Sequence, residues 1–209
     1  MRLNALICRT ATSIVCLLLF NLEQASAADS AEPLSWTAEF FEAGHYEASA
    51  GVGALFSPFL ATKGRPTVNY TITEVQLGYM LSDVHGRAWW RGNFEFAGEA
   101  FGSAVFQGSG SYIAGITAWG RYNFVQQNSR FIPFLQGGAG LTSTDIDNRI
   151  TTQNFNFNLD IGLGARYFFA RNWSVNLEYR YQHISNANTG SHNLGINSHG
   201  PILGVSYLF

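Results

Sequence analysis

Two stretches near the C-terminal end decide the fold: W-S-V-N-L-E-Y-R-Y-Q-H-I-S-N at residues 173–186 and G-P-I-L-G-V-S-Y-L-F at residues 200–209. In both, an apolar or aromatic side chain occupies every second position, and polar or small residues stand between. A period of two places the two sets on opposite faces of an extended strand. Both stretches are therefore predicted to be strands with one apolar face.

The same alternation recurs through the chain, in segments at residues 49–60, 69–82, 88–102, 111–125, 130–141 and 154–169. Charged residues make up only 12% of the chain, against about 25% in ordinary soluble domains, and aromatic residues reach 15%. Lipid cannot satisfy exposed backbone groups, so spanning strands must close on themselves. The sequence predicts an all-β fold, an eight-stranded antiparallel transmembrane β-barrel of the outer membrane.

The N-terminal region has the features of a secretory signal peptide. Arg2 and Arg9 precede or flank a short apolar run at residues 11–20, which leads into A-S-A at residues 25–27. We therefore assign residues 1–27 to a signal peptide, residues 28–48 to a leader that caps one barrel end, and residues 49–209 to the barrel. Cys8 and Cys16 both lie in the signal, so the mature chain is predicted to have no disulfide.

Charges of both signs fall on the polar faces of the predicted strands. An eight-stranded barrel is just wide enough for side chains to fill it, so these charges are predicted to pair in a plugged interior; a catalytic cluster is the alternative. The net charge of −2 excludes a nucleic-acid partner. The predicted inward charges are Glu74, Arg91, Glu95, Glu99, Arg121, Asp160, Arg166, Glu178 and Arg180.

The predicted connections alternate in length, which predicts the orientation. Short links at residues 83–87, 126–129 and 170–172 would face the periplasm, and longer links at 61–68, 103–110, 142–153 and 186–196 would face outward. Trp89, Trp90 and Trp119 are expected in the aromatic girdles at the membrane interfaces. The terminal Phe209 resembles the assembly signal of outer-membrane barrels.

Three polar residues continue the apolar faces of the last two strands. His183 and Ser185 share the parity of the apolar row before them, and Asn197 falls on the corresponding face of the last strand. An imidazole beside a serine can take its proton during attack on an ester, and a third group can hold the other ring nitrogen. The alternative is a strand end that exposes small polar residues at the membrane interface.

The run H-I-S-N-A-N-T-G-S-H-N-L-G-I-N-S at residues 183–198 resembles the signature of the PagL-type lipid A 3-O-deacylases, outer-membrane acyloxyacyl hydrolases. The resemblance implies that His183 is the general base and Ser185 the nucleophile. It assigns Asn193 to the oxyanion hole, together with backbone donors after Ser185. It implies no metal and no cofactor, and a lipid A or lipopolysaccharide substrate among outer-membrane lipids.

Two positions depart from the family pattern: Asn197 replaces the catalytic glutamate, and Asn188 replaces a glycine near the oxyanion hole. An amide can accept the N–H of His183 but cannot stabilise an imidazolium as a carboxylate does. Three outcomes stay open: a triad with Asn197, an acid from the loop such as Asp145 or Asp147, or a weakened enzyme. Glu178 has the wrong parity, because it points into the barrel.

The leading hypothesis is therefore a serine esterase that removes a 3-O-linked acyl chain from lipid A in the outer membrane of a Gram-negative bacterium. The alternative is a non-catalytic small barrel with a structural or adhesive role; a pore is a third hypothesis. A metal site built from His183, His192 and His199 is a lesser alternative. A homodimer stays open.

Overall fold

A computed structural model describes residues 38–57, 67–147, 150–151 and 154–209. The predicted signal peptide and most of the leader lie outside these residues. No helix in the described part of the chain is long and apolar enough to cross a membrane. The strands of this part are β1 (Tyr46–Leu55), β2 (Asn69–Met80), β3 (Asn93–Gln107), β4 (Tyr112–Asn123), β5 (Phe131–Thr144), β6 (Phe155–Phe168), β7 (Trp173–Ser185) and β8 (Ile196–Leu208).

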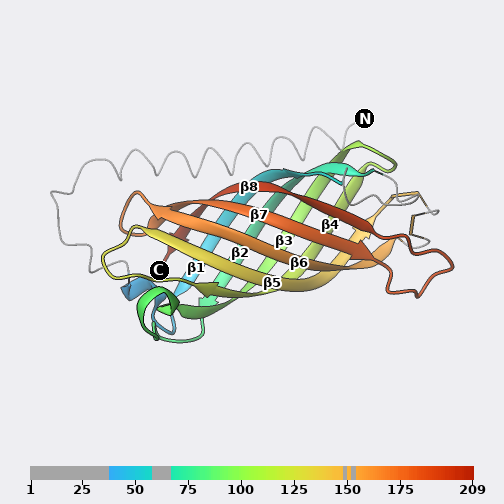
Figure 1. Cartoon of the computed structure of the whole chain (residues 1–209). Helices are drawn as coiled ribbons and strands as arrows, with labels where there is room; N and C mark the ends of the chain where they lie inside the picture. The colour runs from blue at the N-terminus through green and yellow to red at the C-terminus, as the bar shows by residue number, and fades with distance from the viewer. Residues whose placement is uncertain (1–37, 58–66, 148–149, 152–153) are drawn as a thin grey trace. The chain divides into compact units, whose positions relative to one another are not determined.

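The eight strands form a closed antiparallel barrel in sequence order (Figure 1). Each strand pairs with the next along the chain, and β1 pairs with β8 to close the sheet, with Ala50 opposite Val205. Closure leaves no edge strand, so the backbone groups of the barrel wall are paired within the sheet. The predicted fold class is confirmed.

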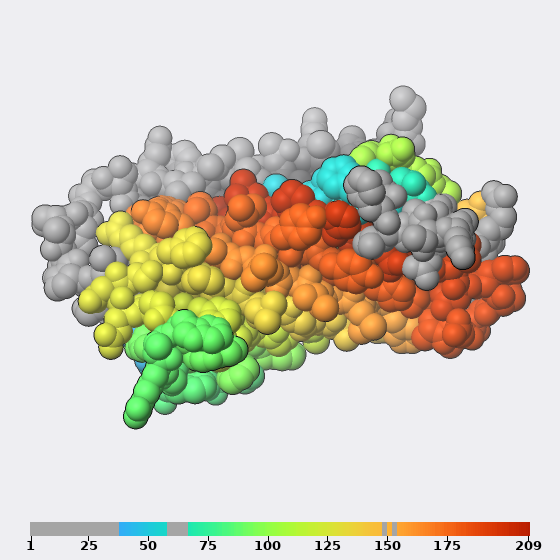
Figure 2. All heavy atoms as spheres, viewed as in Figure 1, coloured from blue at the N-terminus to red at the C-terminus, as the bar shows by residue number. Residues whose placement is uncertain are grey.

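Side chains alternate between the barrel interior and its outer wall, as the period of two predicts. In β2 the burial alternates at every position from Thr71 to Met80, and β3, β6 and β8 show the same pattern over most of their length. The outer wall carries exposed apolar side chains, among them Val75, Leu77, Phe96, Ile116, Leu159, Ile161, Leu163, Leu177 and Leu203. Figure 2 shows one face of this wall, with the β6–β8 region in orange and red. Exposed apolar surface all around a barrel is the surface that lipid requires.

One buried ion cluster lies around Arg180 on β7. Its guanidinium contacts Glu74 at 2.8 Å, Glu99 at 3.0 Å and Glu178 at 2.9 Å. The ring of Trp119 lies beneath it, 4.7 Å from the guanidinium carbon, and donates its indole N–H to Glu99. Trp119 is fully buried, so its predicted place in an interfacial girdle is wrong: it has the inward parity of Arg121.

A second buried cluster joins Arg121 and Arg166 to two glutamates. Arg166 contacts Glu47 at 2.7 Å and Glu95 at 3.2 Å, and Arg121 contacts Glu95 at 3.0 Å. Glu47 belongs to β1, which begins at Tyr46 and so reaches back into the predicted leader. A cavity of about 20 Å³ lies between the clusters, room for about one water molecule. Most of the predicted inward charges are thus paired in the interior, as predicted. Asp160 is also buried, but its carboxylate accepts from the side-chain amide of Asn158 and forms no ion pair within the described residues.

Arg91 is the exception among the predicted inward charges. It lies outside the strands, in the connection at residues 81–92, and its guanidinium donates to the carbonyl of Val125 at 2.6 Å. The chain forms a turn with Gly86 at φ +88° and then the short 3-10 helix η3 (Ala88–Trp90). The strand predicted from residue 88 therefore begins at Asn93, and this connection is longer than predicted.

The opposite error occurs in the next connection. β3 continues to Gln107, because Val105 pairs with Tyr70 and Ala104 with Tyr112. The predicted loop at residues 103–110 thus shrinks to residues 108–111. The long connections 56–68, 145–154 and 186–195 share this barrel end, and the connections 81–92, 124–130 and 169–172 share the other (Figure 1).

A short segment before β1 covers the barrel end that carries the connections 81–92, 124–130 and 169–172. In the 3-10 helix η2 (Glu39–Phe41), Phe40 and Phe41 are buried. The side-chain amide of Asn93 donates to the carbonyl of Phe41 at 2.6 Å. The two phenylalanines belong to an apolar cluster with Met80, Val125, Ile132, Phe168 and Leu208. These contacts cap the barrel end where β8 terminates.

Replacement of Arg180 by alanine should lower the free energy of unfolding by about 3–5 kcal/mol, because it leaves Glu74, Glu99 and Glu178 buried without their cation. The measurement is a urea titration of the barrel in lipid vesicles. The matched control is Arg171→Ala, since Arg171 and Glu39 form an exposed pair at 3.6 Å and such pairs contribute at most about 1 kcal/mol. Equal losses in both variants would contradict a stabilising role for the buried cluster.

Candidate functional site

The candidate site lies where β7 and β8 run side by side on the outer wall. His183 is directly opposite Asn197 in the register of the two strands. Both side chains are half-buried, whereas the neighbouring Ile184 and Ser198 are buried inside the barrel. The predicted parity is thus correct, and it brings together two residues separated by the whole 186–195 connection.

A short hydrogen bond joins the two side chains. Nδ1 of His183 lies 2.6 Å from Oδ1 of Asn197. A carbonyl oxygen is only an acceptor, so Nδ1 carries the ring proton and the lone pair of a neutral imidazole lies on Nε2. This arrangement leaves Nε2 able to accept a proton from a nucleophile.

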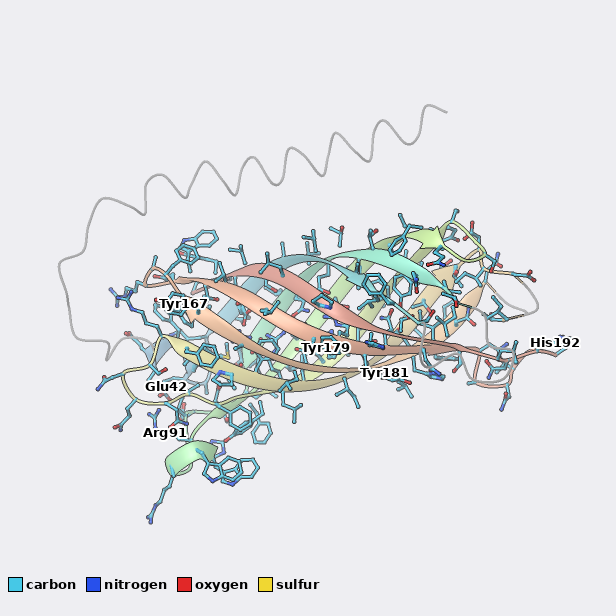
Figure 3. All side chains as sticks on the ribbon, turned by 45° about the horizontal axis from the view of Figure 1, so that its top comes forward. Glu42, Arg91, Tyr167, Tyr179, Tyr181 and His192 are labelled. Atoms are coloured by element: carbon cyan, nitrogen blue, oxygen red, sulfur yellow. The ribbon has the colours of Figure 1, made fainter. Side chains whose placement is uncertain are left out.

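A tyrosine hydroxyl contacts the same amide oxygen. Tyr181 lies two residues before His183 on the same face and donates to Oδ1 of Asn197 at 3.0 Å. Tyr179, one step further along β7, contacts His199 instead. Figure 3 shows Tyr179 and Tyr181 following one another along β7 toward the barrel end where His192 marks the 186–195 connection. Tyr181 is a site residue that the sequence motif does not contain, although its parity on β7 is the same as that of His183.

Ser185 ends β7 on the same face as His183 and is half-buried. Within the described residues no hydrogen bond joins Ser185 to His183; both side chains instead flank Gly195. A Cβ atom at Gly195 would lie 3.2 Å from Cε1 of His183 and 3.6 Å from Cβ of Ser185. Gly195 also has a φ of +67°, in the region that favours glycine. Gly195 belongs to the run at residues 183–198 that carries the family resemblance, but its contact with His183 cannot be predicted from that run.

The chain turns sharply after Ser185. Ala187 and Asn188 both have left-handed backbones, with φ of +52° and +61°. Asparagine tolerates this region better than most residues, so Asn188 can stand at a position where the resemblance implies a glycine. Asn186 holds the turn, because its Oδ1 accepts from the backbone N–H of Asn188 at 3.0 Å and its Nδ2 donates to the carbonyl of His192 at 2.8 Å.

The two residues predicted for the oxyanion hole contact one another in this turn. Nδ2 of Asn193 donates to Oδ1 of Asn188 at 2.9 Å, and Oδ1 of Asn193 accepts from the backbone N–H of Asn186 at 3.2 Å. A side-chain amide has two N–H donors, so one hydrogen atom of the Asn193 amide is available beyond this contact. Asn193 is thereby held close to the residue that follows Ser185.

The other predicted acids lie elsewhere. The carboxylate of Asp145 accepts from the backbone N–H and hydroxyl of Ser111 and from the backbone N–H of Tyr112. Slight burial raises the pKa of Asp145, but the hydrogen bonds with Ser111 and Tyr112 outweigh it, and the net pKa lies below its ordinary value. The backbone N–H of Asp147 contacts Ser109. Both residues thus contact the 108–111 turn, whereas the partner of His183 is Asn197.

The remaining alternatives from the sequence concern Glu178 and the histidines. Glu178 points into the barrel, as predicted, and pairs with Arg180. His183, His192 and His199 do not converge: the described residues contain no group of three or more histidine, cysteine or acidic residues that could hold a metal ion. His199 contacts Tyr179, and His192 lies against Ser191.

A closed eight-stranded barrel with an apolar outer wall defines a small outer-membrane protein. The model of the lipid A 3-O-deacylase (PagL) family matches residues 69–206. The chain therefore belongs to the PagL lipid A 3-O-deacylase family, and it lies in the outer membrane of a Gram-negative bacterium.

Solved structures with the same fold include an enzyme and other barrels. The outer-membrane enzyme PagL is 20% identical, with a TM-score of 0.55 over 76% of this chain and 97% of that one. Neisserial surface protein A is 21% identical, with a TM-score of 0.56 over 80% of this chain and 98% of that one. The N-terminal barrel domain of Pseudomonas aeruginosa OprF is 16% identical, with a TM-score of 0.50 over 80% and 98%. No curated protein sequence matches the chain. At these identities the structures establish the fold alone.

Proposed function

We propose that this protein is a serine esterase that removes the 3-O-linked acyl chain from lipid A. The observation that carries the proposal is the 2.6 Å bond between Nδ1 of His183 and Oδ1 of Asn197 on the face that also carries Ser185. This bond leaves the lone pair of Nε2 of His183 available as the base, on the same strand as the nucleophile Ser185. Membership of the PagL family supports lipid A as the substrate.

The reaction would proceed through an acyl-enzyme. Nε2 of His183 takes the proton of the Ser185 hydroxyl while Oγ attacks the ester carbonyl carbon. The tetrahedral intermediate collapses, the bond from that carbon to the sugar oxygen breaks, and the imidazolium returns its proton to the departing alkoxide. A water molecule then attacks the acyl-enzyme by the same proton transfers, releasing a fatty acid and free Ser185.

The turn after Ser185 would stabilise the negative oxygen of the intermediate. The second N–H of the Asn193 amide, for which the described residues show no acceptor, and the backbone N–H of Ala187 in the left-handed turn are the donors that we assign to this role. Asn188 would act by holding Asn193 through their 2.9 Å contact. Donors fixed before the reaction stabilise developing charge without reorganisation.

The position of the site on the outer wall suits this substrate. Lipid A is anchored in the outer leaflet, and its ester bonds lie where headgroups meet acyl chains. A nucleophile at the end of a membrane-spanning strand, facing lipid, reaches such a bond without extracting the substrate. This requires the end with the 186–195 connection to face outward. Three of the four connections at that end are long, whereas only the 81–92 connection is long at the other end, which favours this orientation.

A neutral Asn197 is the feature that favours the second candidate, a non-catalytic barrel with a structural or adhesive role. Replacement of the triad aspartate by asparagine in a serine protease lowers turnover by on the order of 10⁴, through the wrong imidazole tautomer. Here Oδ1 faces Nδ1, which is the orientation that maintains the productive tautomer. The bond therefore favours catalysis over a structural role alone.

Ser185→Ala should abolish deacylation, with a loss of roughly 10⁴-fold or more. The measurement is mass spectrometry of lipid A from an outer membrane that contains the parent or the variant. The matched control is Ser191→Ala, which removes a hydroxyl from the adjacent 186–195 connection, where it contacts His192. Unchanged lipid A in the parent, with heat-modifiable migration showing a folded barrel, would favour the non-catalytic candidate.

Gly195→Ala should lower deacylation by roughly tenfold or more, because the added Cβ would lie 3.2 Å from the His183 ring and displacement of a catalytic group is costly. The control is Gly98→Ala on β3, where an added Cβ meets no atom within 4 Å. Rates per folded barrel separate loss of activity from loss of protein. Equal rates for the two variants would show that Gly195 does not define the site.

A further inference from the structure

Two donors converge on one oxygen atom in the candidate site. Oδ1 of Asn197 lies 2.6 Å from Nδ1 of His183 and 3.0 Å from the hydroxyl of Tyr181. The register explains the meeting: Asn197 is opposite His183, and Tyr181 is opposite His199, so Tyr181 and Asn197 are diagonal neighbours on one face. A tyrosine at this diagonal can reach the amide without moving the backbone.

The orientation of an amide has a chemical consequence that a carboxylate lacks. The two oxygens of a carboxylate are equivalent acceptors, whereas rotation of an amide exchanges an acceptor for a donor. With Nδ2 of Asn197 turned to His183, Nδ1 would have to accept, and the ring proton would move to Nε2. The imidazole could then not take the proton of Ser185. The Tyr181 hydroxyl, which can donate or accept, would then accept from Nδ2, and its own proton would lose the acceptor that Oδ1 provides.

We infer that Tyr181 is a positioning residue that holds Asn197 with its oxygen toward His183, and so keeps the imidazole in its Nδ1–H tautomer. The inference rests on the proposed esterase function and explains how a neutral residue can stand where the family has a glutamate. Tyr181 acts through Asn197 and does not touch the reacting atoms. All three residues are half-buried, and partial removal from water strengthens a hydrogen bond.

The adjacent tyrosine shows that this contact is specific. Tyr179 has the same parity on β7, but its ring is more exposed and its hydroxyl contacts His199. It therefore provides a control that removes an equivalent hydroxyl from the same strand face without changing the contacts of Asn197.

Tyr181→Phe should lower kcat by roughly 2- to 12-fold, the factor that corresponds to one neutral hydrogen bond, with little change in KM. Tyr179→Phe should leave kcat at the parent value. The decisive variant is Asn197→Asp, which has the same shape but equivalent oxygens. If Tyr181 orients the amide, Tyr181→Phe will have no effect on kcat in the Asn197→Asp background; an equal loss in both backgrounds would overturn the inference.

A second measurement does not depend on activity. The ¹⁵N NMR signals of the histidine rings report their tautomers, and His183→Gln identifies the signals of His183. The parent barrel in lipid nanodiscs should show the Nδ1–H tautomer at His183, and Tyr181→Phe should increase the Nε2–H form, whereas Tyr179→Phe should not.

These readouts separate failure of the inference from failure of the proposed function. An unchanged tautomer in Tyr181→Phe would overturn the role of Tyr181 even in an active enzyme. A tautomer shift in a barrel that leaves lipid A unchanged would support the role of Tyr181 and contradict the proposed esterase function.

Discussion

The structure depends on one constraint: a backbone that crosses lipid must satisfy its own hydrogen bonds. Closure of β1 onto β8 meets this constraint and divides every strand into an inner and an outer row. The outer row must be apolar, which leaves the polar residues to fill the interior. The ion clusters around Arg180 and around Arg121 and Arg166 result from this division, since charges enclosed together must pair.

The candidate site is the place where the outer row stops being apolar. Nearer the middle of β7 and β8, Leu177 and Leu203 face outward; toward the strand ends, His183 and Asn197 occupy the same outer rows. Polar side chains on this face need hydrogen-bond partners, and these two residues bond to one another. The hydrogen bonds that satisfy these groups in lipid are the same bonds that would set the protonation state of a catalytic imidazole.

Asn188 and Asn197, the two departures from the pattern that the resemblance implies, differ in their physical consequences. Asn188 lies at a left-handed position that asparagine tolerates, where a glycine is expected, and it also contacts Asn193. Asn197 loses a negative charge that no described neighbour of His183 supplies. Geometry can replace the acceptor function of the glutamate, because Oδ1 receives the Nδ1 proton. It cannot replace the charge, and this loss makes the orientation of the amide important.

The sequence by itself determined the strand faces, the closed barrel and the opposition of His183 and Asn197. The reason is that the alternation of apolar and polar residues within each strand already decides which side chains face outward, and strand pairing does not change this. It misplaced Arg91 and the ends of β3, where a turn or a partner strand outside the local pattern decides. Trp119 was also misplaced, although its inward parity with Arg121 belongs to the local alternation. Only the tertiary structure decided that Gly195 lies against His183 and that Tyr181 shares the oxygen of Asn197. Those contacts join separate strands and a returning turn, so their distances follow from register and backbone path rather than from residue spacing.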